Sequence, residues 1–308
     1  MKTAFIFPGQ GSQYPGMFKD IYENSRAAKR IFDLCDDALR RQISALCFNG
    51  TQEELNLTQN TQPCVLACDL AAAAALEERG IRPEGTAGFS LGEYAAMAQA
   101  KVLSEEDSFH IVQLRADAMQ EAVLPGEGAM TAIIGLDPHI VEEICRKAEN
   151  YVIPANYNSP VQITISGTRD GVEEAAMQAC KMGGRAWPLP VSAPFHCQLM
   201  KPALGKLEPM LSTVNMMKPS IPVYFNYTGR SADLNMKDLL LRQVYSPVQW
   251  IKTIEAMYKD GFDTFIECGP GKTLSGFVKK ILREKRVSVL NVENKKTLDD
   301  VCKKLGVL

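Results

Sequence analysis

The chain has 308 residues, of which 46% are hydrophobic and 23% are charged, so we expect a globular protein with one large core or two domains. Its formal net charge of −2 gives no general reason to expect binding to nucleic acid or to a membrane. The N-terminal apolar run meets Pro8 too early for a signal peptide, and the most apolar run, residues 63–76, is short and contains Asp69. We therefore expect a cytoplasmic protein.

Cysteine and histidine usage favours neither disulfides nor a metal centre. The nine cysteines form no C-x-x-C pair and several lie in apolar segments, which is typical of buried free thiols in a reducing compartment. The three histidines, at positions 110, 139 and 196, have no metal-ligand spacing. We expect neither a metal nor a cofactor.

The first segments predict a strand and then helices. Residues 2–7 read as a buried strand that ends in a glycine-rich turn around Gln10. Helical periodicity follows over residues 17–48. Thr61 is expected to cap a long alanine-rich helix that ends near residue 80, with Gln62 in its first turn, facing the strand ends where α/β sheets bind ligands.

The segment Gly88-Phe89-Ser90-Leu91-Gly92 fits the G-x-S-x-G nucleophile elbow. By chance, such a pentapeptide occurs in roughly one chain in ten of this length. Here residues 85–89 read as a strand and a helix follows the motif, which is the context that a nucleophile elbow requires. The motif therefore predicts a nucleophilic serine whose hydroxyl lies beside the N–H groups of a helix N-terminus.

An arginine lies in the middle of the next predicted helix, residues 104–122. A cation in such an apolar context is unfavourable unless it is paired, so Arg115 should bond Asp117 or another nearby acid, or face the solvent.

Residues 127–191 predict a separate domain. Their expected order is strand, helix, strand, strand, helix, strand, over residues 129–136, 138–149, 151–157, 162–167, 171–182 and 185–191. This βαββαβ order is that of the ferredoxin-like fold. We expect it to be inserted into a larger domain formed by residues 1–126 and 192–308.

The chain then returns to the larger domain. His196 follows a turn and is expected to begin a helix, and it is the only histidine at the mouth of a loop, so it is the best candidate base for Ser90. Further strands are expected over residues 221–227, 262–267 and 288–292. The predicted class is α/β, with an α/β-hydrolase-like large domain built on a parallel sheet. A basic cluster near the end of the chain (Lys279, Lys280, Arg283, Lys285, Arg286) reads as a solvated face or as a surface for an acidic partner.

Taken together, the motifs resemble those of malonyl-CoA:acyl carrier protein transacylases, which belong to the dissociated fatty-acid synthase and are related to polyketide synthase acyltransferase domains. The resemblance covers essentially the whole chain. It rests on the order and spacing of Phe7–Gln13, Gly88–Glu93, Gln113-Leu114-Arg115, Phe195-His196, Pro247–Trp250 and Glu267–Lys272.

The resemblance implies a role for each matching residue. Ser90 is expected to carry the acyl group, and His196 to act as its base, with the ring oriented by a carbonyl from the segment of Gln243. The backbone N–H groups of Gln10 and Leu91 would form the oxyanion hole.

The resemblance also implies a binding site for the substrate. Arg115 would bind the free carboxylate of malonyl, Gln62 would lie beside the site, and Phe195 would disfavour a methyl branch. The sequence departs from the family at Phe89, where relatives usually have histidine.

The implied function is ping-pong transfer of malonyl from malonyl-CoA to the phosphopantetheine thiol of holo acyl carrier protein, through a malonyl-serine ester, in fatty-acid biosynthesis. The alternatives are an acyltransferase that serves a polyketide synthase, a serine thioesterase or esterase, and a carrier-binding scaffold without catalysis. A monomer is expected.

Overall fold

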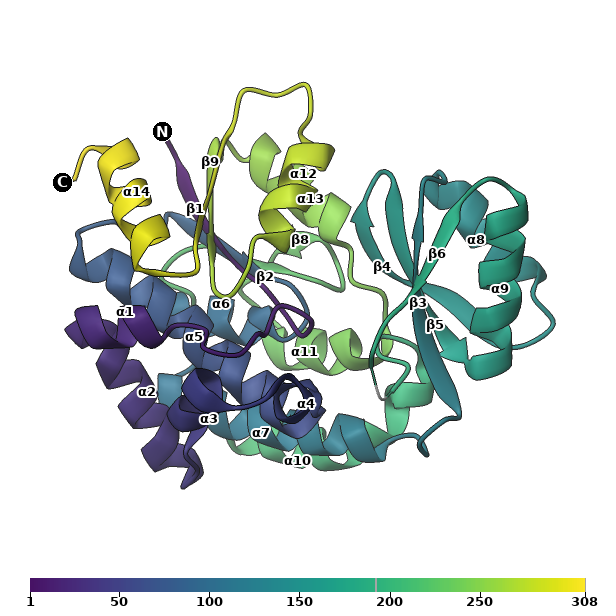
Figure 1. Cartoon of the computed structure of the whole chain (residues 1–308), viewed down its shortest axis with the longest axis horizontal. Helices are drawn as coiled ribbons and strands as arrows, with labels where there is room; N and C mark the ends of the chain where they lie inside the picture. Colours follow the sequence, from purple (N-terminus) through teal and green to yellow (C-terminus); the bar gives the residue numbers. More distant parts are fainter. Residues whose placement is uncertain (192, 308) are drawn as a thin grey trace.

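A computed structural model describes residues 1–191 and 193–307 of the chain. It contains two sheets that lie apart in space (Figure 1). The strands of the larger sheet are β1 (Thr3–Phe7), β2 (Gly85–Gly88), β7 (Val223–Phe225), β8 (Arg230–Ser231), β9 (Thr264–Cys268) and β10 (Ser288–Val292). The strands of the smaller sheet are β3 (Gly128–Ile134), β4 (Val152–Ser159), β5 (Gln162–Thr168) and β6 (Arg185–Pro188).

Helices cover both sheets. Those around the larger sheet are α1 (Lys19–Asn24), α2 (Arg26–Leu39), α3 (Ile43–Asn49), α4 (Gln52–Asn56), α5 (Thr58–Glu78), α6 (Gly92–Gln99), α7 (Glu105–Glu121), the 3-10 helix η1 (Gln198–Ala203), α10 (Leu204–Thr213), α11 (Met236–Tyr245), α12 (Trp250–Lys259), α13 (Thr273–Ile281) and α14 (Lys295–Leu305). The smaller sheet carries α8 (Pro138–Lys147) and α9 (Arg169–Lys181).

The larger sheet has the strand order β10-β9-β1-β2-β7-β8. All its neighbouring pairs are parallel except β7 with β8, so the carboxyl ends of β1, β2, β7 and β9 meet at one edge. The smaller sheet is antiparallel with the order β4-β5-β3-β6, which is the ferredoxin-like arrangement. The predicted α/β class, with a parallel core and a second small sheet, is confirmed.

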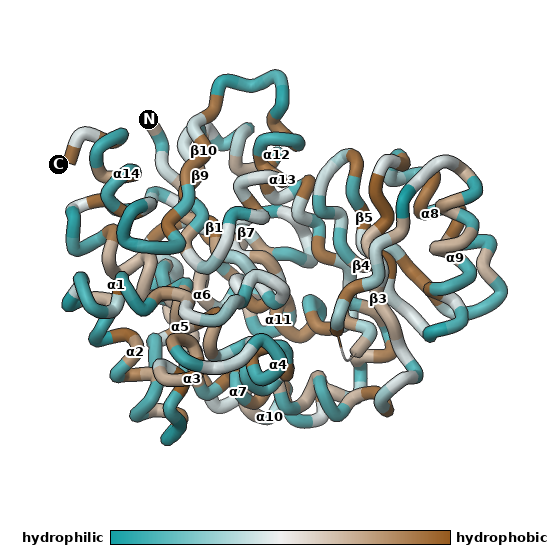
Figure 2. Tube along the Cα trace, in the orientation of Figure 1, coloured by the Kyte–Doolittle hydropathy of each residue, from teal (hydrophilic) through white to brown (hydrophobic). Residues whose placement is uncertain are grey.

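The core lies where α6 packs on β1 and β2 and where α5 packs on α6 and β9. Every residue of β1 is buried, and α5 is buried on nearly all sides, as its run of alanines allows. Figure 2 shows the apolar segments where elements pack together and hydrophilic segments along the outer helices and loops. Among the described residues, no helix is both long enough and apolar enough to span a membrane.

Backbone hydrogen bonds connect the smaller sheet to the segment just before α12. Val248, just before α12, accepts a hydrogen bond from the Tyr157 N–H of β4 (2.9 Å) and donates one to the Ala155 carbonyl (2.8 Å). The division into residues 1–126 with 192–308 and residues 127–191 stays a prediction, and its endpoints at 192 and 308 lie outside the described residues.

Several predicted bounds were wrong. Thr61 does not cap α5, because the helix begins at Thr58 and the Thr61 hydroxyl donates to the Leu55 and Leu57 carbonyls from inside the first turns. The strand expected over residues 221–227 is only Val223–Phe225, and the helical periodicity over residues 17–48 spans three helices, with left-handed Arg40 (φ 49°) ending α2.

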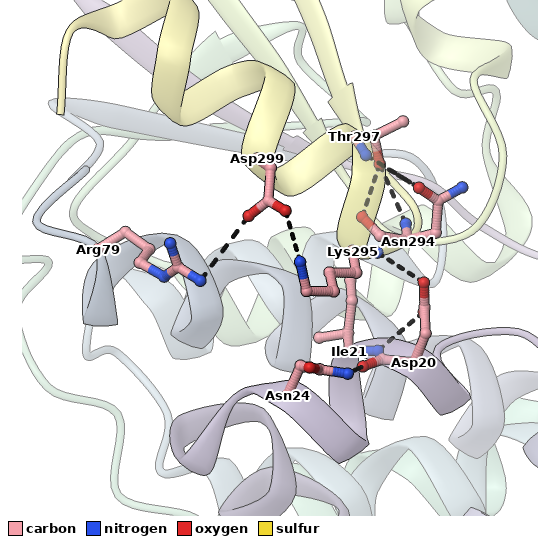
Figure 3. A network of polar contacts seen from close by, with 8 residues as sticks. All are labelled: Asp20, Ile21, Asn24, Arg79, Asn294, Lys295, Thr297 and Asp299. Atoms are coloured by element: carbon pink, nitrogen blue, oxygen red, sulfur yellow. Dashed lines mark hydrogen bonds and ion pairs between the residues drawn. The ribbon is translucent and has the colours of Figure 1, made fainter. Parts of the chain in front are cut away.

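The C-terminal helix is fastened to the N-terminal half of the chain (Figure 3). Asp20 of α1 accepts from the Lys295 N–H (2.8 Å), and Asp299 bonds the Lys295 side chain (2.7 Å) and lies 3.8 Å from Arg79 at the end of α5. A capping box of Asn294 and Thr297 closes the start of α14. These contacts hold β10, which precedes α14, at the edge of the sheet.

Candidate active site

The turn between β2 and α6 places Ser90 at its tip. Ser90 has φ 54°, a left-handed conformation that is unfavourable for a residue with a side chain. The flanking glycines permit the turn, because a Cβ at Gly88 would lie 1.8 Å from the Gly92 carbonyl oxygen and one at Gly92 would lie 2.2 Å from that of Phe7. The two glycines therefore leave room for a tight turn that carries Ser90 at its tip.

His196 bonds the Ser90 hydroxyl. Its Nε2 lies 2.7 Å from Ser90 Oγ, and its Nδ1 lies 2.8 Å from the backbone oxygen of Gln243 in α11. A carbonyl oxygen can only accept, so Nδ1 carries the hydrogen and Nε2 offers its lone pair to the Ser90 hydroxyl. His196 has φ 61° and lies ahead of η1, so the prediction that it begins a helix was wrong.

Burial keeps the His196 imidazole neutral. Its side chain is buried, and desolvation, followed by the positive charge of Arg115, lowers its pKa from 6.5 to about 4. At neutral pH the ring is therefore free to accept a proton from Ser90.

Arg115 of α7 is buried, with a relative exposure of 1%, and bonds only neutral groups. Its guanidinium donates to Gln62 Oε1 (2.8 Å), Gln243 Oε1 (3.0 Å) and Ser90 Oγ (3.1 Å). No carboxylate of the described residues forms an ion pair with it. The expectations of a bond to Asp117 or of a solvent-facing side chain were wrong, because Asp117 instead accepts from Gln113 (3.1 Å).

A cavity of about 60 Å³ opens above these groups. It is lined by Ser90, Arg115 and His196 together with Gln10, Gln62, Phe89, Met119, Met130, Asn156, Leu189, Val191 and Phe195. A second cavity of about 160 Å³ shares Gln10, Phe89, Asn156 and Leu189 with it and extends between α13 and the smaller sheet. The reactive groups thus lie at the inner end of a path between the two sheets.

Gln10 and Leu91 carry the two backbone N–H groups that are expected to form an oxyanion hole. Gln10 follows β1 in the glycine-rich turn, and Leu91 precedes the first residue of α6. Within the described part of the chain, neither of their N–H groups has an intramolecular acceptor. The N-terminus of α6 adds its partial positive charge beside Ser90.

Six of the predicted site residues line this cavity, namely Gln10, Gln62, Ser90, Arg115, Phe195 and His196. Gln243 is not among the lining residues but bonds two that are, Arg115 through its side chain and His196 through its carbonyl. Leu91 follows Ser90 in the chain and does not line the cavity. Phe89 packs edge-on against Trp250, with ring centroids 5.5 Å apart. The other two histidines do not line this cavity, since the side chain of His110 is 41% exposed beside Glu106 and that of His139 is 90% exposed beside Glu142. No group of three or more metal-ligating side chains occurs in residues 1–191 and 193–307.

Two further residues at the elbow had no signal in the sequence. Asn226 and Glu93 are both fully buried behind Ser90 and bond each other. An asparagine in a turn and an acid in the first turn of a helix are ordinary at those positions, and neither suggested a site.

Comparisons with known proteins agree over almost the full chain. The family model of the acyl transferase domain matches residues 4–302. The chain is 45% identical to the malonyl CoA-acyl carrier protein transacylase of Bacillus subtilis, covering 97% of this chain and 95% of that protein. It superimposes on a malonyl CoA-acyl carrier protein transacylase from Clostridium perfringens with a TM-score of 0.95, 42% identity and coverage of 99% and 98%.

A third relative was solved with a partner. It is a malonyl-transacylase in complex with a type II PKS acyl-carrier protein, with a TM-score of 0.94, 37% identity and coverage of 99% of this chain and 100% of that chain. On the motifs, the fold and these matches, the chain belongs to the malonyl CoA-acyl carrier protein transacylases of the acyl transferase family.

Proposed function

We propose that this enzyme transfers a malonyl group from malonyl-CoA to the phosphopantetheine thiol of holo acyl carrier protein in fatty-acid biosynthesis. The observation that carries the proposal is Arg115, a buried cation that forms no ion pair among the described residues and lies 3.1 Å from Ser90 Oγ. A guanidinium fork matches a carboxylate in geometry and charge. The free carboxylate of a malonyl group on Ser90 would supply the missing anion.

The first half-reaction forms an ester on Ser90. Ser90 Oγ attacks the thioester carbonyl carbon, and its proton passes to His196 Nε2. The tetrahedral oxygen would accept from the N–H groups of Gln10 and Leu91, each worth on the order of 3 kcal/mol of transition-state stabilisation. When the carbon–sulfur bond breaks, His196 returns the proton to the departing CoA sulfur, and malonyl stays as an oxygen ester.

The second half-reaction reverses these steps with a different thiol. The phosphopantetheine sulfur of the carrier attacks the ester carbonyl after His196 has taken its proton, and that proton then goes to the departing Ser90 oxygen. Because CoA leaves before the carrier protein enters, the kinetics should be ping-pong. The path between the two sheets, about 160 Å³ beyond the inner cavity, suits a long, thin pantetheine arm.

The alternatives fit the site less well. A simple thioesterase or esterase has no use for a buried cation beside its nucleophile, and a scaffold without catalysis needs neither Ser90 nor His196. Service to a polyketide synthase would use the same chemistry and differ only in the carrier, and one relative was solved with such a carrier. Transfer assays with carrier proteins of both pathways distinguish the two.

The experiment that tests the proposal is intact mass measurement after incubation with malonyl-CoA. We expect a malonyl adduct on the parent enzyme and on Ser212→Ala, which alters an exposed serine. Ser90→Ala should show none. If the parent forms no adduct, covalent catalysis at Ser90 is wrong.

Monomeric state, cytoplasmic location and the absence of nucleic-acid and membrane partners are also part of the proposal. They rest on the sequence, with its net charge of −2 and its free cysteines. Light scattering at micromolar concentration tests the first of them.

A further inference from the structure

The side chain of Asn226 forms hydrogen bonds with two residues of the nucleophile elbow. Asn226 follows β7 directly and is completely buried. Its Oδ1 accepts from the Ser90 N–H (2.6 Å), and its Nδ2 donates to the Gly88 carbonyl. The oxygen of this one amide therefore accepts from the nucleophile, Ser90, and its nitrogen donates to Gly88, the last residue of β2.

The Asn226 backbone is itself held on both sides. Its N–H donates to Glu93 Oε2 in the first turn of α6 (2.6 Å), and its carbonyl accepts from the Gln249 N–H just before α12 (2.9 Å). The amide thus has a fixed position relative to the sheet, and the elbow is bonded to it. Gln243 Nε2 completes the arrangement by donating to the Ser90 carbonyl (2.8 Å).

Ser90 needs such support because its backbone is left-handed at φ 54°. Rotation back toward an ordinary conformation would turn Oγ away from His196 Nε2, which it meets at 2.7 Å. The same rotation would move the Leu91 N–H, which follows Ser90 in the chain. Bonds to the N–H and the carbonyl of Ser90, from Asn226 and Gln243, prevent that rotation.

We propose that Asn226 is a positioning residue for the nucleophile, and that Glu93 is the support that holds Asn226. Asn226 touches no reacting atom and acts through the conformation of Ser90. The inference rests on the proposed acyl transfer, since it is the formation of the Ser90 ester that Asn226 would promote.

The variant Asn226→Asp tests this with a pH switch. A protonated carboxyl group has one acceptor and one donor, as the amide has, whereas a carboxylate has only acceptors and would face the Gly88 carbonyl oxygen. Burial should raise the pKa of the introduced carboxyl group. The ionisable groups around it are Glu93 and Tyr94 of α6, Arg115 of α7, and His196 beyond Ser90.

The test can be run between pH 5 and pH 8, because the pKa of His196 is about 4 and its ring stays neutral over that range. Burial raises the pKa of Glu93 to about 8, so each variant is compared with the parent at the same pH. At pH 8 we expect Asn226→Asp to acylate Ser90 about 100-fold more slowly than the parent, as for a small misplacement of a nucleophile. At pH 5 the ratio should recover to within about tenfold. The KM for malonyl-CoA should change little at either pH.

Two further variants complete the experiment. Asn226→Ala lacks both bonds and should be slow at pH 5 and pH 8 alike, while Asn215→Asp, which adds an exposed carboxylate, should follow the parent throughout. Circular dichroism at each pH shows whether the variants are folded. The inference is overturned if folded Asn226→Ala follows the parent at both pH values, or if the activity of either Asn226 variant falls only where it unfolds. A parent without an adduct would overturn the proposed function instead.

Discussion

Arg115 carries a positive charge into the interior with only amide and hydroxyl oxygens as its direct hydrogen-bond partners. If the missing anion is the malonyl carboxylate, Arg115→Ala should lower malonyl transfer at least about 100-fold, the value of a charge-assisted bidentate pair. Transfer of acetyl, which has no carboxylate, should fall much less. The measurement is kcat/KM for malonyl-CoA and acetyl-CoA with the same carrier.

Arg146→Ala is the matched control, because Arg146 is exposed on α8 and should leave both rates unchanged. Equal losses with malonyl-CoA and acetyl-CoA in Arg115→Ala would mean that the guanidinium supports the site without reading the carboxylate.

His196 sets the acid limb of the pH profile. Protonation removes the lone pair that accepts from Ser90, so activity is lost as pH falls through the folded-state pKa of about 4. We expect kcat/KM for malonyl-CoA to stay level between about pH 5 and pH 7 and to fall below that range. An acid limb centred near 6.5 would indicate an ordinary, hydrated imidazole.

At the scale of residues, motif chemistry predicted more than composition did. Ser90 and His196 could be found from an elbow and from the position of one histidine, and Gln10 and Gln62 from a glycine-rich turn and the start of a helix. The resemblance gave these last two their roles and added Leu91, Phe195 and Gln243 as candidates. The partners of Arg115 could not be found, because Gln62 and Gln243 lie 53 and 128 positions away and bond it only once the chain is folded.

At the scale of elements, α5 carries an ionisable group into the core. Asp69 is fully buried next to Gly269, and neither of its carboxyl oxygens has a hydrogen-bond partner among the described residues. Nearby Glu267 accepts from the Leu274 and Ser275 N–H groups at the start of α13, so that carboxylate is the better stabilised of the two. Burial, and then the charge of Glu267, raise the pKa of Asp69 well above its usual value.

This raised pKa predicts a stability that depends on pH. The folded state keeps the Asp69 proton to higher pH than the unfolded state, so the free energy of unfolding falls as pH rises above about 4. Asp69→Asn removes the titration and should gain stability relative to the parent by roughly 1 kcal/mol per pH unit above that value. Urea unfolding at pH 5 and pH 8 measures the difference, and a constant difference would contradict the prediction.

Hydrophobic periodicity predicted the type of most elements, helix or strand, but local backbone geometry determines where each element begins and ends. The alanine-rich run predicted α5, yet its start moved from Thr61 to Thr58, because the threonine hydroxyl bonds carbonyls of the preceding turn as readily as it caps. The helical periodicity over residues 17–48 did not show where α2 ends, because the break is at left-handed Arg40 and no glycine marks it.

At the scale of the whole molecule, the smaller sheet bears directly on the catalytic base. Gly128 begins β3, and a Cβ there would lie 2.4 Å from the Pro194 ring, two residues before His196. Gly128→Ala should therefore displace the Phe195-His196 segment and lower kcat by roughly 10- to 100-fold, with little change in KM for malonyl-CoA. Steady-state kinetics test this.

Gly205→Ala is the control for replacing a glycine by an alanine. Gly205 lies in α10 with nothing near its Cβ position, so the variant should keep its activity and gain about 0.5–1 kcal/mol of stability. Wild-type kcat in Gly128→Ala would show that Pro194 can move without carrying His196.

The sequence predicted two sheets, but not how they meet. Strand order in the larger sheet, the bonds of Val248 to β4, and the approach of Asn226 to Ser90 across 136 positions all depend on tertiary packing. No local pattern encodes such pairs, which is why the supports behind the elbow emerged only from the structure.

The close backbone contacts at Gly88 and Gly92 also limit which substitutions the elbow can accept during evolution. Neither position can accept a side chain without moving a neighbouring strand or helix, so both must stay glycine for the backbone to keep its path through the elbow. Phe89 and Phe195 line the cavity without bearing that constraint. Substitutions at these two positions on the cavity wall can therefore accumulate while the backbone of the elbow, and with it Ser90, keeps its path.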